Sequence, residues 1–320
     1  MASHLTLQER ERVSQMVHAH RSQAEIARRL KRHPATISRE LQRNCSPNGY
    51  WAASAQTRAE ARCRNRPRIC KMQRPKVANY VRDGLRQYWS PDEIAGRSRK
   101  DFPDNAHRRV SRQTIYAWIH AQRAAGAHWH RYLRRLGRVR RRSENRGQLA
   151  ACVSIEGRPV VVDRRARYGD WEGDTVVGRA HQGGAVTLVD RKSGYLLLGK
   201  VADRHASTVR QAITDLICPL PAGLRRTLTL DNGKEFAEHE LLATQAALRV
   251  YFARPYCAWQ RGTNENTNGL VRQFFPKGSD LAHMPAQRFE KVQHLLNHRP
   301  RRRLGYQTPL EILSSRLRCD

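Results

Sequence analysis

Short segments with alternating apolar and polar faces fill the first 44 residues, and helix-start signals precede them. Thr6 is followed three residues later by Glu9, and Ser22 by Glu25, two pairs typical of helix N-termini. Pro34 suits the first turn of a further helix, because the N–H that proline lacks would have no partner there. Apolar residues recur at helical spacing after each start. The pattern predicts three helices between residues 5 and 43.

Two short helices joined by a tight turn are typical of a helix-turn-helix, whose second helix can enter the DNA major groove. The last predicted helix, PATISRELQRN, carries Thr36, Ser38, Arg39 and Arg43. Their hydroxyl and guanidinium groups can reach base edges and phosphates. We therefore predict a DNA-binding domain over residues 1–50. An ordinary helical bundle with a solvated basic face is the alternative.

Two further basic segments follow this domain. Residues 51–89 hold a run of arginines and lysines in which the helical pattern decays around Pro67, so we predict a basic linker or arm along phosphates. Residues 90–146 contain two more helix starts, at Ser90 and Ser111, and end in a dense basic connector. We predict a second helix-turn-helix-like region there, with packing alone as the alternative to DNA contact.

The pattern changes to that of strands in the second half of the chain. DWEGDTVVGR, AVTLVD and YLLLGKVA are successive strand candidates, and the turn at 190–194 joins the last two as a hairpin. A helix, the run RTLTLD at 226–231, a second helix, the run RVYFA and a closing helical region follow. This order predicts an α/β fold with a mixed sheet over residues 155–316.

Three carboxylates occupy related places in this predicted fold. Asp174 falls in the first strand, Asp231 ends the fourth, and Glu265 lies in the closing helix. Neighbouring strands lie about 4.8 Å apart, so acids on two of them can share a cation. Taken singly, Asp231 also fits a turn, Asp174 a turn cap and Glu265 a solvated helix position. Their joint placement favours a common site.

Carboxylate oxygens are the ligands that Mg²⁺ prefers, and water or phosphate oxygens complete its coordination. Two ions about 3.5–4 Å apart can stabilise the attacking and the leaving oxygen of a phosphodiester displacement. Without metal, three clustered carboxylates would repel one another. We therefore predict an enzyme that cuts or joins a DNA or RNA backbone with two Mg²⁺ ions, for which Mn²⁺ can substitute.

The charge balance supports a polyanionic partner. Lys and Arg number 60 against 28 Asp and Glu, a formal net charge of +32. Residues 1–150 hold 34 basic and 11 acidic residues, against 26 and 17 in residues 151–320. The charge of the first half is therefore typical of a nucleic-acid-binding region, whereas the second half retains acidic residues that its function requires. Ribosomal-type RNA binding is the alternative that the charge alone would allow.

Other classes are disfavoured. No apolar stretch approaches the roughly 20 residues needed to span a bilayer, and the first residues lack the apolar segment of a secretory signal. Seven cysteines without a CxxC pair predict neither a disulfide framework nor a zinc site. We expect a cytoplasmic, nucleoid-associated protein with no membrane partner.

Several sequence blocks together resemble the insertion-sequence-thirty family of bacterial DDE transposases. The most specific of them are WSPDEIAGR, WEGDTVVG, TLTLDNGKEF, PYCAWQRGTNENTNGLVRQFFPKG and LNHRPRRRLGYQTPLEIL. The resemblance covers nearly the whole chain. It implies a ribonuclease H-like, retroviral-integrase-type catalytic core in which Asp174, Asp231 and Glu265 form the catalytic and metal-binding triad.

The resemblance also implies the partners. They are double-stranded DNA at the element's terminal inverted repeats and at the target site, bound by a homo-oligomer. Three residues beside the triad, Asn264, Asn268 and Arg272, are candidates for hydrogen bonds to DNA, and the basic run at 299–303 for contacts with the backbone. The alternative functions are a sequence-specific DNA-binding repressor with an inactive catalytic domain, and a nuclease that cuts without joining ends.

Overall fold

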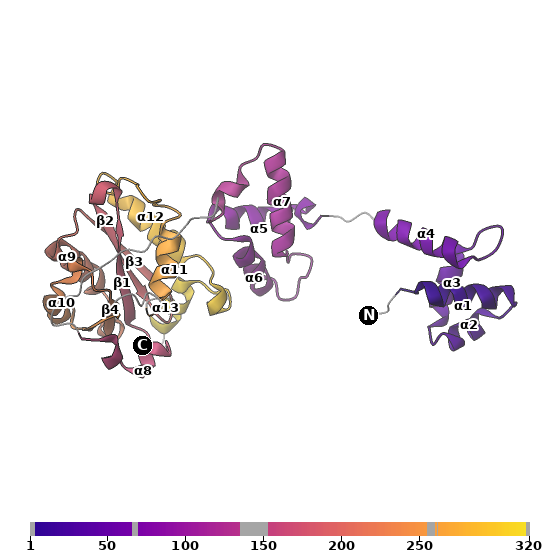
Figure 1. Cartoon of the computed structure of the whole chain (residues 1–320), viewed down its shortest axis with the longest axis horizontal. Helices are drawn as coiled ribbons and strands as arrows, with labels where there is room; N and C mark the ends of the chain where they lie inside the picture. Colours follow the sequence, from indigo (N-terminus) through magenta and orange to yellow (C-terminus); the bar gives the residue numbers. More distant parts are fainter. Residues whose placement is uncertain (1–3, 66–69, 135–152, 255–259, 261, 318–320) are drawn as a thin grey trace. The chain divides into compact units, whose positions relative to one another are not determined.

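A computed structural model describes residues 4–65, 70–134, 153–254, 260 and 262–317 (Figure 1). The chain divides into two compact units, residues 1–69 and residues 70–320. The first unit is entirely helical, and the second combines a helical region with a five-stranded sheet. An α/β core preceded by an all-α region was predicted from the sequence, and this part of the prediction is confirmed.

Four helices make up the N-terminal unit: α1 (Leu7–His18), α2 (Gln23–Arg29), α3 (Pro34–Asn44) and α4 (Ala52–Asn65). The predicted starts are all present. The Thr6 hydroxyl accepts from the Glu9 N–H while the Glu9 carboxylate accepts from the Thr6 N–H, and Pro34 occupies the first turn of α3. The three predicted helices are therefore confirmed, with α2 and α3 as the helix-turn-helix pair.

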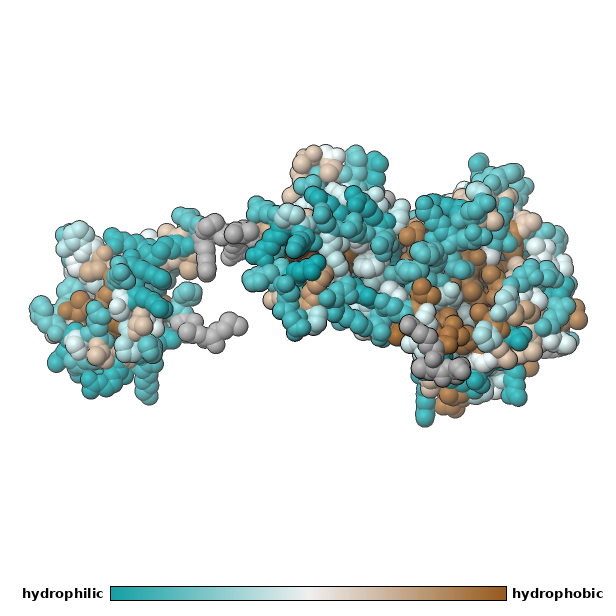
Figure 2. All heavy atoms as spheres, turned by 180° about the vertical axis from the view of Figure 1, so that it is seen from behind, coloured by the Kyte–Doolittle hydropathy of each residue, from teal (hydrophilic) through white to brown (hydrophobic). Residues whose placement is uncertain are grey.

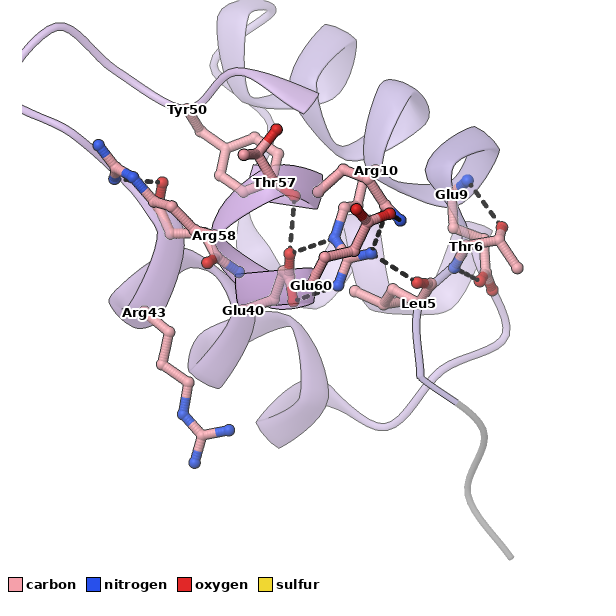
Figure 3. A network of polar contacts seen from close by, with 12 residues as sticks. Leu5, Thr6, Glu9, Arg10, Glu40, Arg43, Tyr50, Thr57, Arg58 and Glu60 are labelled. Carbon is pink, nitrogen blue, oxygen red and sulfur yellow. Dashed lines mark hydrogen bonds and ion pairs between the residues drawn. The ribbon is translucent and has the colours of Figure 1, made fainter. Parts of the chain in front are cut away.

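A buried ion pair joins α1 to α3 (Figure 3). The Arg10 guanidinium donates to Glu40 at 2.8 Å and to the Leu5 carbonyl at 2.7 Å, and the Tyr50 hydroxyl donates to Glu40 at 3.0 Å. Arg10 is only 4% exposed. Because each charge has several partners, the pair fixes the angle between the helices at little cost in unsatisfied polar groups.

Residues 51–89, predicted as a basic linker or arm, contain two helices that belong to different units. Residues 52–65 form α4, which packs on α1, and residues 75–86 form α5 of the second unit. Two arginines of α4 bind the C-terminal end of α3. Arg58 donates to the Asn44 carbonyl, and Arg62 donates to the Arg43 carbonyl. Cations stabilise the carbonyl end of a helix, so a basic run here builds the fold.

The second unit begins with a helical region made of α5 (Pro75–Arg86), α6 (Pro91–Asp101), α7 (Arg112–Ala124) and a short 3-10 helix (Trp129–Tyr132). Ser90 and Ser111 cap α6 and α7, as their sequence predicted. Buried side chains of all three long helices, such as Leu85, Ile94 and Ile115, form its core. Residues 135–152, which hold most of the predicted basic connector, lie outside the described residues.

This helical region is docked on the C-terminal segment of the same unit. Arg97 of α6 donates to both carboxylate oxygens of Glu311, at 2.8 and 2.7 Å. Arg299 is 2% exposed and donates to Glu93 at 2.9 Å. The prediction that Arg299 contacts the DNA backbone is therefore wrong, because its charge is buried and paired inside the protein.

The sheet has the order β3-β2-β1-β4-β5, in which β1, β2 and β3 are antiparallel neighbours and β1, β4 and β5 are parallel. The strands are β1 (Asp170–Val177), β2 (Gly184–Asp190), β3 (Leu196–Val201), β4 (Thr227–Leu230) and β5 (Arg249–Phe252). Four of the five lie within the runs predicted as strands, and β2 begins one residue before its run, at Gly184. The hairpin between β2 and β3 and the mixed sheet are confirmed.

Helices cover both faces of the sheet (Figure 1). On one face α9 (Ala206–Ile217) and α10 (His239–Ala246) enclose a core that includes Trp171 and Leu228. On the other face α11 (Gly262–Val271) and α12 (Ala286–Asn297) pack on Val176 and Val189. The remaining helices are α8 (Val160–Asp163) and α13 (Pro309–Leu317). Glu265 of the predicted triad lies on α11.

Gly173 leaves room for leucine side chains of the neighbouring strands β4 and β2. A Cβ at this position would lie 2.6 Å from the Leu230 side chain and 3.2 Å from Leu188. Any larger residue would have to displace this packed core, so the glycine of WEGD follows from packing.

No helix in the described segments is both long and apolar enough to cross a bilayer. Figure 2 shows that hydrophilic residues cover most of the visible face of the N-terminal unit, whereas hydrophobic residues gather over part of the sheet-containing region.

Candidate active site

Alternation along β1 sorts its side chains between the two faces of the sheet. Trp171 and Gly173 face the core beneath α9 and α10, so Glu172, Asp174 and Val176 face α11 and α12. Asp174 is half-buried and stands opposite Thr187 of β2. The strand therefore presents two carboxylates, two residues apart, to one helix.

Asp231 directly follows β4, the strand that pairs with β1. The parallel register pairs Asp170 with Thr227 and Glu172 with Thr229. The ladder ends at Glu172 and Thr229; extrapolated by two residues, this register would make Asp174 and Asp231 neighbours on the same face, at the strand spacing of about 4.8 Å. The structure thus supports the predicted placement of the two aspartates on neighbouring strands.

The turn predicted as the alternative for Asp231 is also present. The Gly233 N–H donates to the Asp231 carboxylate at 3.2 Å, and Asn232 donates to the Ala253 carbonyl after β5 at 2.7 Å. Asp231 is 8% exposed. The turn holds this carboxylate at the end of β4, so the turn and the site are compatible.

Glu265 lies in the first turn of α11 and is exposed. Its neighbour Asn264 attaches this turn to β1: the Asn264 N–H donates to the Glu172 carboxylate at 2.8 Å, and its side-chain amide donates to the Glu172 carbonyl at 3.2 Å. Within the segments that the structure describes, however, no three His, Cys, Asp or Glu side chains are grouped closely enough to hold a metal ion. Convergence of the full triad therefore stays a prediction.

Asn264 does not have the role that the sequence suggested. It is completely buried, and its amide and backbone N–H bind Glu172 while its carbonyl oxygen accepts from the Thr187 hydroxyl at 3.2 Å. The predicted DNA contact of Asn264 is therefore wrong, because no part of its side chain reaches the surface. It positions α11 on the sheet instead.

Asn268, one turn further along α11, contacts the predicted triad directly. Its amide donates to Asp174 Oδ2 at 2.9 Å, and its carbonyl oxygen accepts from the Thr187 hydroxyl at 2.8 Å. The Thr175 N–H donates to Asp174 Oδ1 at 2.8 Å. These two donors fix the direction of the Asp174 carboxylate, so Asn268 has a positioning role that the DNA-contact prediction did not include.

Arg272 binds the backbone at the end of β1. Both terminal nitrogens of its guanidinium group donate to the Val177 carbonyl at 3.2 Å. Burial lowers the pKa of Arg272, and the nearby Asp174 carboxylate opposes this shift.

Beneath the site, Glu172 and Arg191 form a buried ion pair. Glu172 is 0% and Arg191 6% exposed, and the Arg191 guanidinium donates to the Glu172 carboxylate and to the Val162 carbonyl. Burial lowers the pKa of Arg191, while Glu172 counteracts part of the shift. Because Glu172 also accepts from Asn264, this pair supports the first turn of α11.

Two further acids, one on β1 and one after β4, have structural roles. Asp170 is 1% exposed and pairs with Arg167 at 2.9 Å. Glu235 accepts from Arg204 at 2.6 Å and from the Thr175 hydroxyl at 3.0 Å. Burial raises the pKa of Glu235, but its own N–H and Arg204 lower it by more, so the net shift is downward. Both carboxylates already have cationic partners.

On the N-terminal unit, three of the four predicted DNA-contact residues are exposed on α3. Ser38, Arg39 and Arg43 are exposed and Thr36 is half-buried, while Ile37 between them is 0% exposed and holds the helix to the core. In Figure 3 the Arg43 side chain extends away from the buried network. This face of α3 is geometrically suited to a DNA groove, and its contacts remain a prediction.

Sequence reasoning missed Thr187 and Arg191. Thr187 is completely buried, and its hydroxyl lies within hydrogen-bond distance of Asn264, Asn268 and the Asp174 carbonyl. The only signal in the sequence is a polar residue in the apolar run AVTLVD. Such a residue has to find partners inside the protein.

Comparison with known proteins agrees with this architecture. Residues 2–44 match the model of a helix-turn-helix domain, and residues 164–258 match that of an integrase core domain. The chain is 39% identical to the transposase InsI of insertion sequence element IS30A from Escherichia coli K12, over 97% of this chain and 83% of that protein. It is 36% identical to the transposase of IS4351 from Bacteroides fragilis, over 97% and 95%. It is also 39% identical to the transposase of IS1086 from Cupriavidus metallidurans, over 90% and 88%.

Proposed function

Because this chain belongs to the IS30 family of insertion-sequence transposases, we propose that it cleaves DNA at the ends of its element and joins those ends to target DNA. The observation that carries the proposal is the parallel pairing of β1, which contains Asp174, with β4, which Asp231 directly follows, within an integrase core. The helix that carries Glu265 is attached to the same strand through Asn264.

An integrase core implies a divalent metal, and we assign it to Asp174, Asp231 and Glu265. Their donor set consists of carboxylate oxygens alone, which fits Mg²⁺. Mn²⁺ prefers the same kind of oxygen ligand. When bound, two such ions would stabilise the charge that develops on the attacking and leaving oxygens.

The protein's own residues fix the orientation of the carboxylate oxygens. Asn268 and the Thr175 N–H hold the Asp174 carboxylate, and the Gly233 N–H holds that of Asp231. Asn264 and Glu172 hold the first turn of α11 against the sheet. Groups fixed in this way need no rearrangement as charge develops during the reaction.

A strand-transfer assay on a labelled terminal repeat tests the function. The purified protein and Mg²⁺ should release a 3′ end and join it to a second duplex. Binding without cleavage would favour a repressor with an inactive catalytic domain, and cleavage without joining would favour a nuclease. Because two ends have to meet, we also propose that the protein acts as a homo-oligomer on DNA.

Replacing Asn268 with alanine should raise the Mg²⁺ concentration that gives half-maximal cleavage by about 10- to 100-fold, because the Asp174 carboxylate loses an orienting donor. A Mg²⁺ titration of the initial cleavage rate measures this. Asn266→Ala is the matched control, since Asn266 lies on the same helix, is exposed and contacts Arg134. An equal shift in both variants would refute the positioning role.

The N-terminal unit is proposed to bind the terminal repeats through α3. Removing Arg39 or Arg43 should weaken binding and reduce the slope of log Kd against log salt by about one for each phosphate that the variant no longer binds. Arg249→Ala is a charge-matched control, because Arg249 is exposed on β5 of the other unit. Fluorescence anisotropy over a salt series gives both slopes, and unchanged slopes for the α3 variants would place the DNA-binding residues elsewhere.

A further inference from the structure

A pocket of about 470 Å³ opens on the helical region of the second unit, between the end of α5 and the 3-10 helix that follows α7. Six residues line it, three with aromatic rings and three with arginine or histidine side chains: Arg86, Tyr88, His128, Trp129, Arg131 and Tyr132. None of these six side chains is acidic. Such a lining suits a flat, anionic ligand of small-molecule size.

The rings of the pocket are held in place from behind. Tyr132 lies against Tyr88 with centroids 5.4 Å apart and against Trp129 at 5.8 Å, and Trp118 supports Trp129 at 5.5 Å. Tyr88 has a φ of +61°, fixed where α5 ends. The three lining rings are half-buried, so they keep exposed surface although their positions are set. Preset aromatic faces lower the entropic cost of binding a planar group.

Basic side chains surround these rings. The Arg86 guanidinium lies 5.8 Å from the Trp129 ring centroid, and His128 and Arg131 are exposed. Arg86 also contacts Asp83 at 3.0 Å, but both side chains are more than half exposed. Exposed ion pairs of this kind are weak, so Arg86 can exchange Asp83 for a phosphate.

The pocket lies beside the helix of the proposed active site. The Tyr132 carbonyl accepts from Gln273, which follows α11, at 3.1 Å. Two residues later, Arg134 contacts Asn266, the neighbour of Glu265, at 3.4 Å. The pocket and the first turn of α11 are thus connected through one short segment.

We propose that this pocket binds one unpaired nucleotide of the DNA strand next to the cleaved bond. The base stacks on Trp129 and Tyr132, and its phosphate pairs with Arg86 and Arg131. This assignment rests on the proposed function, because a nucleotide reaches this pocket only when a DNA strand is bound along α11. Aromatic rings within a basic groove are the usual means of binding single strands without sequence preference.

The test compares a short oligothymidylate with an abasic oligonucleotide of the same length and charge. Binding is measured by anisotropy without metal, in the Asp231→Asn background, so that the result does not depend on cleavage. This background chain should bind the oligothymidylate about 5- to 100-fold more tightly than the abasic strand. The additional substitution Trp129→Leu should remove that preference, and Trp129→Phe should retain most of it.

Trp118→Leu serves as the structural control, because Trp118 belongs to the same aromatic cluster but does not line the pocket. It should leave the preference intact. If Trp118→Leu removes the preference as fully as Trp129→Leu does, or if the parent chain does not distinguish the two strands, the pocket assignment is overturned. The proposed strand transfer would stand in either case, since it is measured separately on the unsubstituted protein.

Discussion

Strand cleavage is expected to fall at least ~1000-fold when Asp231 is replaced by asparagine, which corresponds to about 4 kcal/mol of transition-state stabilisation. The asparagine keeps the shape of the side chain and can still accept the hydrogen bond from Gly233, so the turn after β4 should survive. What it removes is the negative charge beside Asp174. A gel assay on a labelled terminal repeat with Mg²⁺ measures the effect.

Binding of the same DNA should be unchanged in this variant, because the proposed contacts of α3 lie in the other unit. Glu235→Gln provides a comparison, since Glu235 is a buried acid that pairs with Arg204 and has no assigned metal role. Its rate should fall much less than that of Asp231→Asn. Cleavage at the normal rate by Asp231→Asn would contradict the assignment of the triad.

The largest expected effect on stability comes from replacing Arg191 with alanine. Glu172 is completely buried and would lose its cationic partner, and an uncompensated buried charge costs about 3–5 kcal/mol. Urea unfolding followed by tryptophan fluorescence measures the loss. Five of the six tryptophans lie in residues 70–320, so this signal reports mainly on the second unit.

A double variant separates the ion pair from the packing around it. Arg191→Met with Glu172→Gln removes both charges and keeps most of the volume, so it should recover a large part of the lost free energy of unfolding. If Arg191→Ala alone costs less than about 1 kcal/mol, Glu172 is not the buried charge described above, and its support of α11 would have to be abandoned.

Local signals predicted most of the fold. Capping pairs such as Thr6 with Glu9 and Ser22 with Glu25 act over one helical turn, so the sequence alone defines them. The strands were recognisable because β-branched and apolar runs between turns are typical of a buried sheet. The two aspartates were placed correctly because each lies in or directly after such a run.

The partners of polar side chains could not be predicted in the same way. Asn264 lies on a helix with a surface-like composition, and only the packing of α11 on β1 shows that its amide binds Glu172. Arg299 belongs to a run of arginines, yet it is buried against Glu93, more than two hundred residues earlier. The basic residues of α4 likewise cap α3 instead of forming an arm. In each case a contact distant in sequence decides the role.

The central claim is that Asp174, Asp231 and Glu265 share divalent cations at a DNA end. Anomalous diffraction from crystals of the full chain, bound to a terminal-repeat duplex and soaked with Mn²⁺, tests it most directly. We predict a Mn²⁺ peak within direct coordination distance of oxygens from all three carboxylates. Mn²⁺ bound elsewhere, with these carboxylates turned towards separate sites, would contradict the account.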